Sequence, residues 1–295
     1  MNDYKPTHLD LFSGIGGFSL AFEAEGFKTI AFVENNREAS KVLADKWPGV
    51  PNLKDVTKLC RRCYDCESYE SDEDGEIIWC KRCNADFGDC ECVGTDAFLD
   101  EHGTPDVITG GVPCQPASAI GQMRGTADER WLWPDTIRIM RELMPRYALF
   151  ENPPSVLSVD GGRAWNGIVS ELAALGYDMQ WDVVPAAAIG AGHLRERIFL
   201  LCSDSDGARL ERHARNEQRS REAWKCGAEQ NRPTSTPDLR RLQIDTPAWY
   251  KAQSPVLPLA NGIPSRLAEC AIRCAGNAVV PQVAQIFARA IRQQF

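Results

Sequence analysis

A single cysteine held between two prolines is the side chain best placed to do chemistry in this sequence. Cys114 lies in the run Gly-Gly-Val-Pro-Cys-Gln-Pro (110–116), directly after the apolar stretch 106–109. Proline fixes φ and disfavours helical geometry in the residue before it, so the run predicts a tight turn at the end of a strand. Chemistry in α/β sheets is placed at this end of the strands. We therefore interpret Cys114 as a nucleophile, with a buried structural cysteine as the alternative.

A glycine-rich turn near the N-terminus predicts a nucleotide-binding site. The run Ser-Gly-Ile-Gly-Gly (13–17) follows the apolar residues 7–12, and Glu34 closes the next apolar stretch, 20 residues after Gly14. Glycines let the backbone approach a ligand, the following helix offers free N–H groups, and the carboxylate can accept both ribose hydroxyls. The spacing departs from G-x-G-x-x-G, because Ser19 occupies the third glycine position.

A cluster of cysteines predicts a metal site. Seven of the 12 cysteines fall within residues 60–92, where Cys63/Cys66 and Cys80/Cys83 form two Cys-x2-Cys pairs separated by 13 residues. That spacing is typical of a zinc ribbon, in which four thiolates surround a tetrahedral ion. The segment has few aliphatic residues, so we expect a structural zinc to replace a hydrophobic core. The alternative ligand set is Cys80, Cys83, Cys90 and Cys92. Seven thiolates could also hold two ions, and disulfides are the remaining interpretation.

Alternating apolar and amphipathic segments predict the scaffold that positions these residues. We expect strands at residues 7–12, 29–33, 53–56, 106–109, 147–150, 178–184 and 197–202. We expect helices at residues 18–25, 36–46, 133–143 and 164–175, and a further amphipathic helix after Gly276. Strands that alternate with helices indicate an α/β fold with a doubly wound, mostly parallel sheet.

Composition and charge narrow the function classes. The chain is 43% hydrophobic and 25% charged, and it contains no run of about 18 apolar residues that would predict a membrane span. Its N-terminus lacks the basic-then-apolar pattern of a signal peptide, so we expect a cytoplasmic protein. The net charge is −8, but residues 60–101 alone carry 13 acidic and 4 basic side chains, a net −9. The remainder is near neutral and residues 207–241 are locally +4, so nucleic-acid binding is not excluded.

Motifs spread over most of the chain resemble, in content and order, those of the cytosine-5 methyltransferases. They are Asp-Leu-Phe-Ser-Gly-Ile-Gly-Gly-Phe (10–18), Glu34, Lys-Asp-Val-Thr (54–57), the cysteine run 110–118, Glu-Asn-Pro (151–153), Arg-Glu-Arg-Ile-Phe (195–199) and Gly-Asn-Ala-Val-Val-Pro (276–281). The resemblance covers residues 1–59, 104–202 and 262–295. The run Val-Val-Pro-Gln-Val-Ala (279–284) resembles bacterial members associated with phages.

The resemblance implies S-adenosylmethionine as the cofactor, with NAD as a minor alternative, and it assigns roles to individual residues. In the catalytic set, Cys114 would add to C6 of cytosine, Glu151 would act at N3, and Arg195 would lie near O2. Arg197 would anchor the site or support Glu151. The residues expected at the cofactor are Phe12, Gly14, Ile15, Gly17, Glu34, Asp55, Pro113 and Asn277.

The resemblance also divides the chain into three parts. Residues 1–59, 104–202 and 262–295 would form the catalytic domain, residues 60–101 a cysteine-rich zinc-binding insert, and residues 203–261 a target-recognition region. Because the target carbon is inaccessible inside a duplex stack, the base must be flipped out, and the loop 116–131 would close over it.

The expected activity is methylation of cytosine C5 in double-stranded DNA at a short specific sequence. A monomer is the expected state, and a restriction endonuclease is a possible companion that the reaction does not require. One alternative is methylation of cytosine in tRNA by a protein of the same fold. Another is a zinc-containing DNA-binding regulator that has lost catalysis.

Overall fold

The computed structural model describes residues 4–60, 69–71, 77–80, 85–86, 93–94, 98, 102–114, 131–189, 195–204 and 278–295. Its strands are β1 (Thr7–Leu11), β2 (Lys28–Val33), β3 (Leu59–Cys60), β4 (Tyr69–Ser71), β5 (Ile77–Cys80), β6 (Ala85–Asp86), β7 (Val93–Gly94), β8 (Val107–Gly111), β9 (Tyr147–Asn152), β10 (Tyr177–Pro185) and β11 (Glu196–Asp204). Its α-helices are α1 (Gly17–Ala24), α2 (Arg37–Lys46), α5 (Trp133–Leu143), α6 (Arg163–Ala174) and α9 (Pro281–Arg292), with 3-10 segments at Pro154–Gly162 and Ala186–Ile189.

A six-stranded sheet in the order β10-β11-β9-β8-β1-β2 forms the centre of the fold. β2, β1, β8 and β9 run parallel to one another, whereas β11 is antiparallel to both β9 and β10. The prediction of an α/β protein with a mostly parallel sheet is therefore confirmed. Because the four parallel strands point the same way, their carboxyl ends meet at one edge, where ligands of such folds bind.

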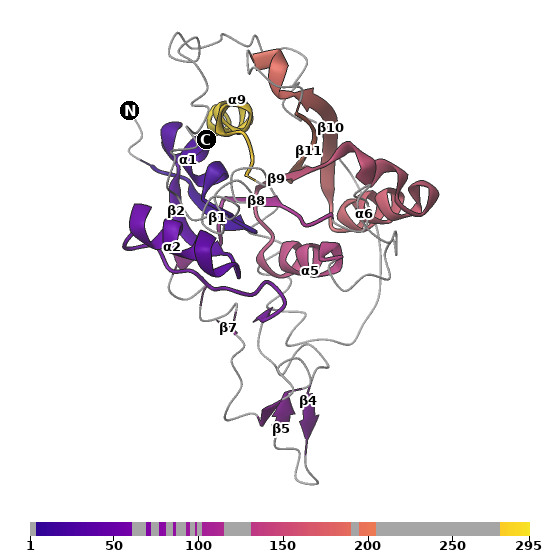
Figure 1. The fold of residues 1–295 in the computed structure, drawn as a ribbon. Coiled ribbons are helices and arrows are strands. Elements are labelled where there is room, and N and C mark those ends of the chain that lie inside the picture. The colour runs from indigo at the N-terminus through magenta and orange to yellow at the C-terminus, as the bar shows by residue number, and fades with distance from the viewer. Residues whose placement is uncertain are drawn as a thin grey trace, which may run out of the picture.

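Helices cover both faces of this sheet, as Figure 1 shows. Helices α1 and α9 lie side by side on one face, and α5 and α6 cover the other. The alternation of side chains along β9 produces the division, since Leu149 belongs to the cluster under α1 and α9 while Ala148 and Phe150 belong to the cluster under α5 and α6. Burial on both faces explains why β8 and β9 read as continuous apolar runs.

The helix after Gly276 is confirmed as α9, with proline at its first turn and a buried apolar face. It contacts the C-terminal end of α1 through residues that lie 260 and 264 positions apart in sequence. Gln285 Nε2 donates to Glu25 Oε1 at 2.7 Å, and Arg289 forms an ion pair with the same carboxylate at 2.9 Å. Within the described residues, no helix is long and apolar enough to cross a membrane.

The strand expected at residues 53–56 is wrong. In its place the chain makes one parallel bridge between Phe32 and Asn52 and then turns. The turn closes because Asp55 Oδ1 accepts hydrogen bonds from the backbone N–H and the hydroxyl of Thr57, a local side-chain turn that competes with strand pairing. Lys54 takes a left-handed conformation at φ 67°, which also ends extended geometry.

The two ends of the cysteine-rich segment lie together and adjoin the main core. β3 pairs in parallel with β7, and Leu59 and Phe98 belong to the main hydrophobic core. Arg138 of α5 donates to the carbonyl oxygens of Val56 and Leu59, which fixes the entry to the segment. Cys80 ends β5, whereas the predicted ligands Cys63, Cys66 and Cys83 lie outside the described residues, so the zinc site stays a prediction.

Candidate active site

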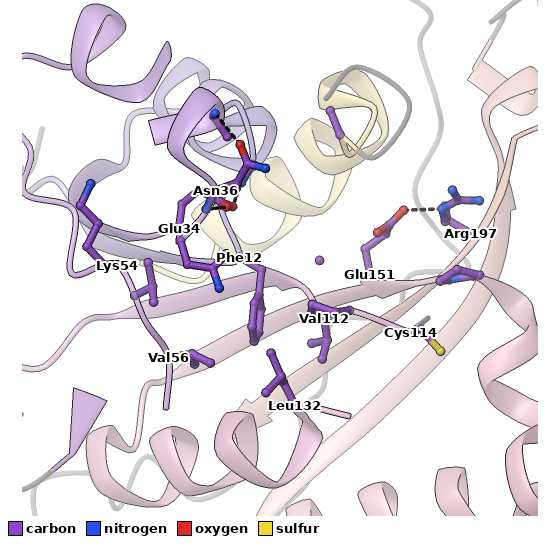
Figure 2. Close-up of a pocket in the computed structure, with 18 of the residues that line it drawn as sticks. Phe12, Glu34, Asn36, Lys54, Val56, Val112, Cys114, Leu132, Glu151 and Arg197 are labelled. Atoms are coloured by element: carbon purple, nitrogen blue, oxygen red, sulfur yellow. Dashed lines mark hydrogen bonds and ion pairs between the residues drawn. The ribbon is translucent and has the colours of Figure 1, made fainter. Parts of the chain in front are cut away.

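A cavity of about 400 Å³ lies where the carboxyl ends of β1, β2, β8 and β9 meet. Its size falls within the range of nucleotide and small-molecule sites. Eight of the residues predicted for the site line this single cavity. They are Phe12, Gly14, Glu34, Pro113, Cys114, Glu151, Arg195 and Arg197. Figure 2 shows Glu34 and Asn36 at one end and Cys114, Glu151 and Arg197 at the other, with Phe12 and Val112 between them.

Glu34, at the end of β2, organises the first end of the cavity. Its Oε2 accepts from the backbone N–H of Gly14 at 2.7 Å, and its Oε1 accepts from the backbone N–H of Asn36 at 2.7 Å. The side chain is therefore fixed in place by two amides while the residue remains 9% exposed on the cavity wall. Each carboxylate oxygen keeps a further lone pair, so the carboxylate can still accept hydrogen bonds from the two hydroxyls of a bound diol.

The glycine turn between β1 and α1 depends on unusual backbone angles. Gly14 and Gly16 take positive φ values of 54° and 85°, where glycine carries no steric penalty. Phe12 also takes a positive φ, 52°, which costs a residue with a side chain about 1–3 kcal/mol and is typical of functional positions. The strained residue lines the cavity, so the strain places its ring and backbone at the ligand site.

Gly17 serves packing rather than the cavity wall. A Cβ at this position would lie 2.7 Å from Val279 Cγ1 and 2.9 Å from the Val279 carbonyl oxygen. The missing side chain lets the segment that precedes α9 pass directly over the start of α1. A role for Gly17 at the cofactor is thus indirect, through the position of this segment.

Three other residues predicted at the cofactor do not line the cavity as described. Ile15 lies in the glycine turn, and the Asp55 carboxylate is engaged by Thr57, although the neighbours Lys54 and Val56 line the wall. Asn277 lies outside the described residues, and the adjacent Ala278 reaches the cavity. Their roles remain predictions.

The second end of the cavity holds a thiol and a carboxyl on neighbouring strands. Cys114 follows β8 and Glu151 lies in β9, and their residues are 6% and 5% exposed. Register pairs Gly111 with Glu151, which places the carboxyl beside the segment that leads from β8 to Cys114. The strand pairing thus explains how residues that are far apart in sequence come to share one site.

Two arginines of the β11 segment approach the Glu151 carboxyl. Arg197 Nε lies 2.7 Å from Glu151 Oε1, and Arg195 Nη2 lies 3.8 Å from the same oxygen. Burial raises the pKa of Glu151, and the positive charges of Arg197 and Arg195 offset part of that increase. A raised pKa keeps a proton available on the carboxyl at higher pH than usual, which suits a general acid.

Arg195 connects the second end of the cavity to the segment before α9. Its Nη2 donates to the Ala278 carbonyl oxygen at 2.8 Å, and its side chain is 17% exposed. Burial and the neighbouring Arg197 both lower the pKa of Arg195. Since Val279 packs on Gly17, the same short segment contacts the glycine turn and the arginine.

Sequence analysis missed several residues of the cavity wall. Asn36 caps α2 by accepting from the N–H groups of Glu38 and Ala39, and an N-cap before a helix was a recognisable signal for it. Lys54, Val56, Leu132 and Ala278 also line the wall. Leu132 lies directly before α5, and no local pattern in the sequence distinguishes it from an ordinary core residue.

The fold and the site together define an α/β protein with a nucleotide-type pocket that ends at a buried thiol and carboxyl. The sequence profile described as C-5 cytosine-specific DNA methylase matches residues 7–73 and 66–246. This match extends over most of the chain, and the chain belongs to that family.

Two curated relatives are consistent with the family assignment, and a solved structure is also similar to this chain. The type II methyltransferase M.AplI of Arthrospira platensis is 34% identical over 194 residues, which cover 65% of this chain and 44% of the relative. M.HgiCII of Herpetosiphon aurantiacus is 28% identical over 197 residues, 65% of this chain and 36% of the relative. The solved structure of the S. pombe Dnmt2 methyltransferase is 17% identical with a TM-score of 0.47, and it covers 68% of this chain and 51% of that one. The chain spans less than half the length of the two curated relatives.

Proposed function

We propose that the chain transfers a methyl group from S-adenosylmethionine to C5 of cytosine in double-stranded DNA at a short specific sequence. The observation that carries the proposal is a single cavity with Glu34 and the glycine turn at one end and Cys114, Glu151 and Arg195 at the other. Such an arrangement lets a bound cofactor face a base that enters beside the thiol. Membership of the family supports the same reaction.

The residues at the first end fit this cofactor. Glu34 presents acceptor oxygens for ribose hydroxyls, and the left-handed glycine turn lets backbone approach the ligand closely. Apolar side chains of Phe12, Val56 and Leu132 provide a surface for a flat base. Bound S-adenosylmethionine would supply an electrophilic methyl group to this cavity.

The catalytic residues would act in order on the cytosine. The Cys114 thiolate forms a bond to C6, which turns C5 into a nucleophilic enamine carbon. Glu151 donates a hydrogen bond to N3 and Arg195 stabilises the charge that develops at O2, while Arg197 holds Glu151 in place. Transfer of the methyl group to C5 would release S-adenosylhomocysteine. A base such as water would then take the C5 proton, and the electrons of that C–H bond would restore the C5–C6 double bond while the C6–sulfur bond breaks and frees Cys114 as a thiolate.

Recognition of DNA is proposed for parts of the sequence outside the described residues. The base is inaccessible in the duplex, so the proposal includes base flipping, at a cost of a few kcal/mol. Loop 116–131 would close over the flipped base, and residues 203–261, rich in arginine, would read the target. A restriction endonuclease and a monomeric state remain parts of the proposal that the reaction itself does not require.

A labelled-methyl assay with purified protein tests the function. Wild-type protein is expected to transfer methyl from S-adenosylmethionine to double-stranded DNA and not to tRNA, and Cys114→Ser is expected to lose transfer while still binding S-adenosylhomocysteine. Methyl transfer to tRNA and not to DNA would contradict the proposal and identify RNA as the substrate. Cofactor binding with no transfer to either would indicate a regulator that has lost catalysis.

The zinc-ribbon proposal rests on cysteine spacing alone. Cys63, Cys66, Cys80 and Cys83 remain the proposed ligands, with the Cys80, Cys83, Cys90 and Cys92 set as the alternative. Metal analysis of the purified protein is expected to give at least one equivalent of zinc. Less than about half an equivalent would contradict the proposal. If zinc is present, the double variant Cys63→Ser/Cys66→Ser distinguishes the two ligand sets, because it lowers the zinc content only if the first set is correct.

A further inference from the structure

A chain of buried polar side chains crosses the sheet beneath the glycine turn, and the proposed mechanism uses none of them. His8 and Asp10 come from β1, Thr29 from β2, Thr109 from β8 and Ser19 from α1. All five are between 0% and 3% exposed. Buried polar groups are costly unless they are fully hydrogen-bonded, so the contacts of each group need to be accounted for.

Asp10 is the centre of this chain. Ser19 Oγ donates to Asp10 Oδ2 at 2.7 Å, and Thr109 Oγ1 donates to Asp10 Oδ1 at 3.1 Å. Ser19 lies in the first turns of α1, directly after the glycine turn, and Thr109 lies five residues before Cys114. Burial raises the pKa of Asp10 to about 7, and this single carboxyl ties together α1, which follows the glycine turn, and β8, which leads to Cys114.

His8 completes the hydrogen bonds of Thr109. Its Nε2 lies 2.8 Å from Thr109 Oγ1, its Nδ1 lies 3.3 Å from Thr29 Oγ1, and its ring stacks on Phe22. Burial lowers the pKa of His8 to about 3, so the ring is neutral. The Thr29 hydroxyl can then donate to Nδ1 and the Nε2–H to Thr109, which leaves the single Thr109 proton for Asp10. In this order each hydroxyl donates once and no donor is unused.

We propose that Asp10 is a positioning residue for the methyl transfer described above. Through Ser19 it holds the start of α1 and thus the glycine turn, and through Thr109 it holds β8, the strand that leads to Cys114. Ser19 occupies the position where the dinucleotide pattern has its third glycine, and the hydrogen bond to Asp10 gives the hydroxyl a function there. Only the part of the proposal that links Asp10 through Thr109 to Cys114 rests on the proposed function.

Variants that each remove one arm test the proposal. Ser19→Ala is expected to weaken S-adenosylhomocysteine binding about 5- to 10-fold in calorimetry, with kcat at saturating cofactor within about twofold of wild type. Thr109→Val is expected to lower kcat about 5- to 10-fold with cofactor affinity within about twofold. Asp10→Asn, which turns one acceptor into a donor, is expected to impair both quantities.

The matched control is Tyr177→Phe in β10, the strand at the opposite edge of the sheet from β2. Tyr177 is 1% exposed, its hydroxyl donates to the Pro145 carbonyl oxygen at 2.8 Å, and it does not line the cavity. It is expected to change thermal stability but neither cofactor affinity nor kcat. If Thr109→Val and Ser19→Ala behave like this control, the network is only structural and the proposal is overturned. If the wild type binds cofactor but transfers no methyl group, the proposed function fails, and the effect of Ser19→Ala on binding still decides the cofactor arm.

Discussion

The two ends of the cavity each present a buried glutamate, and their surroundings give them opposite chemistry. Glu34 is held by the backbone N–H groups of Gly14 and Asn36, whereas Glu151 faces the guanidinium groups of Arg197 and Arg195. Backbone donors fix a carboxylate as an acceptor for a ligand. Desolvation raises the pKa of Glu151 and keeps a proton available for donation. The two arginine partners of Glu151 oppose that increase, so burial rather than its partners distinguishes Glu151 as the proposed proton donor.

The largest expected difference between the two ends comes from the catalytic glutamate. Glu151→Gln removes the transferable proton, so we expect kcat to fall about 10²- to 10⁴-fold, which is the usual contribution of general acid catalysis. Binding of S-adenosylhomocysteine should stay within about twofold of wild type, because Glu151 lies at the other end of the cavity. Steady-state kinetics and calorimetry measure the two quantities. An equal loss of kcat and of cofactor affinity would contradict the assignment of separate roles to the two ends of the cavity.

The converse variant concerns the first end. Glu34→Gln keeps the size of the side chain but replaces a charged acceptor, so cofactor affinity should fall about 10- to 100-fold, as expected for hydrogen bonds to a charged group. At saturating cofactor, kcat should remain within about threefold of wild type. A fall in kcat that saturating cofactor cannot restore would show that Glu34 also acts in the chemical step.

The segment before α9 joins the two ends, and its packing can be tested by stability. Gly17→Ala places a Cβ 2.7–2.9 Å from Val279, and the clash involves backbone, so we expect a loss of about 1–3 kcal/mol in the free energy of unfolding. Urea unfolding measures it. The control is Gly167→Ala in α6, where nothing lies within 4 Å of the added atom, and helix propensity predicts a gain of up to about 1 kcal/mol. Equal effects of the two variants would contradict the packing role of Gly17.

The smallest expected effect is a shift in pH dependence. The charge of Arg197 lowers the pKa of Glu151, so Arg197→Ala should raise that pKa further. The protonated carboxyl would then persist to higher pH, and the alkaline limb of the kcat profile should move upward by at most about one pH unit. A downward shift, measured with double-stranded DNA at saturating cofactor, would contradict the arrangement of charges described for this end.

Local patterns in the sequence predict the frame of the molecule, and the resemblance to the cytosine-5 methyltransferases predicts most of the residues at its cavity. Helix α5 occupies the predicted residues, and the other predicted helices and strands of the sheet lie within a few residues of their expected positions, except at residues 53–56. Gly14, Glu34 and Cys114 could be found because each lies one to three residues after the end of a strand. Residues 53–56 failed because the Asp55 side chain closes a turn that an apolar pattern does not reveal.

The contacts between distant elements could not be predicted from local patterns. The hydrogen bond from Arg195 to Ala278 joins residues 83 positions apart, and that between Thr109 and Asp10 joins residues 99 positions apart. Both depend on the order of strands in the sheet and on the placement of α9. Burial also makes His8 and Asp10 unusual, whereas in the sequence they read as ordinary polar residues of an alternating strand.

Bisulfite sequencing tests the central claim most directly, because it measures both the reaction and its target. Genomic DNA would come from a methylation-free host that expresses the wild-type chain or Cys114→Ser. The account predicts 5-methylcytosine at one short sequence in the first case and none in the second. Absence of 5-methylcytosine with a well-folded, cofactor-binding wild type, or its persistence in Cys114→Ser, would contradict it.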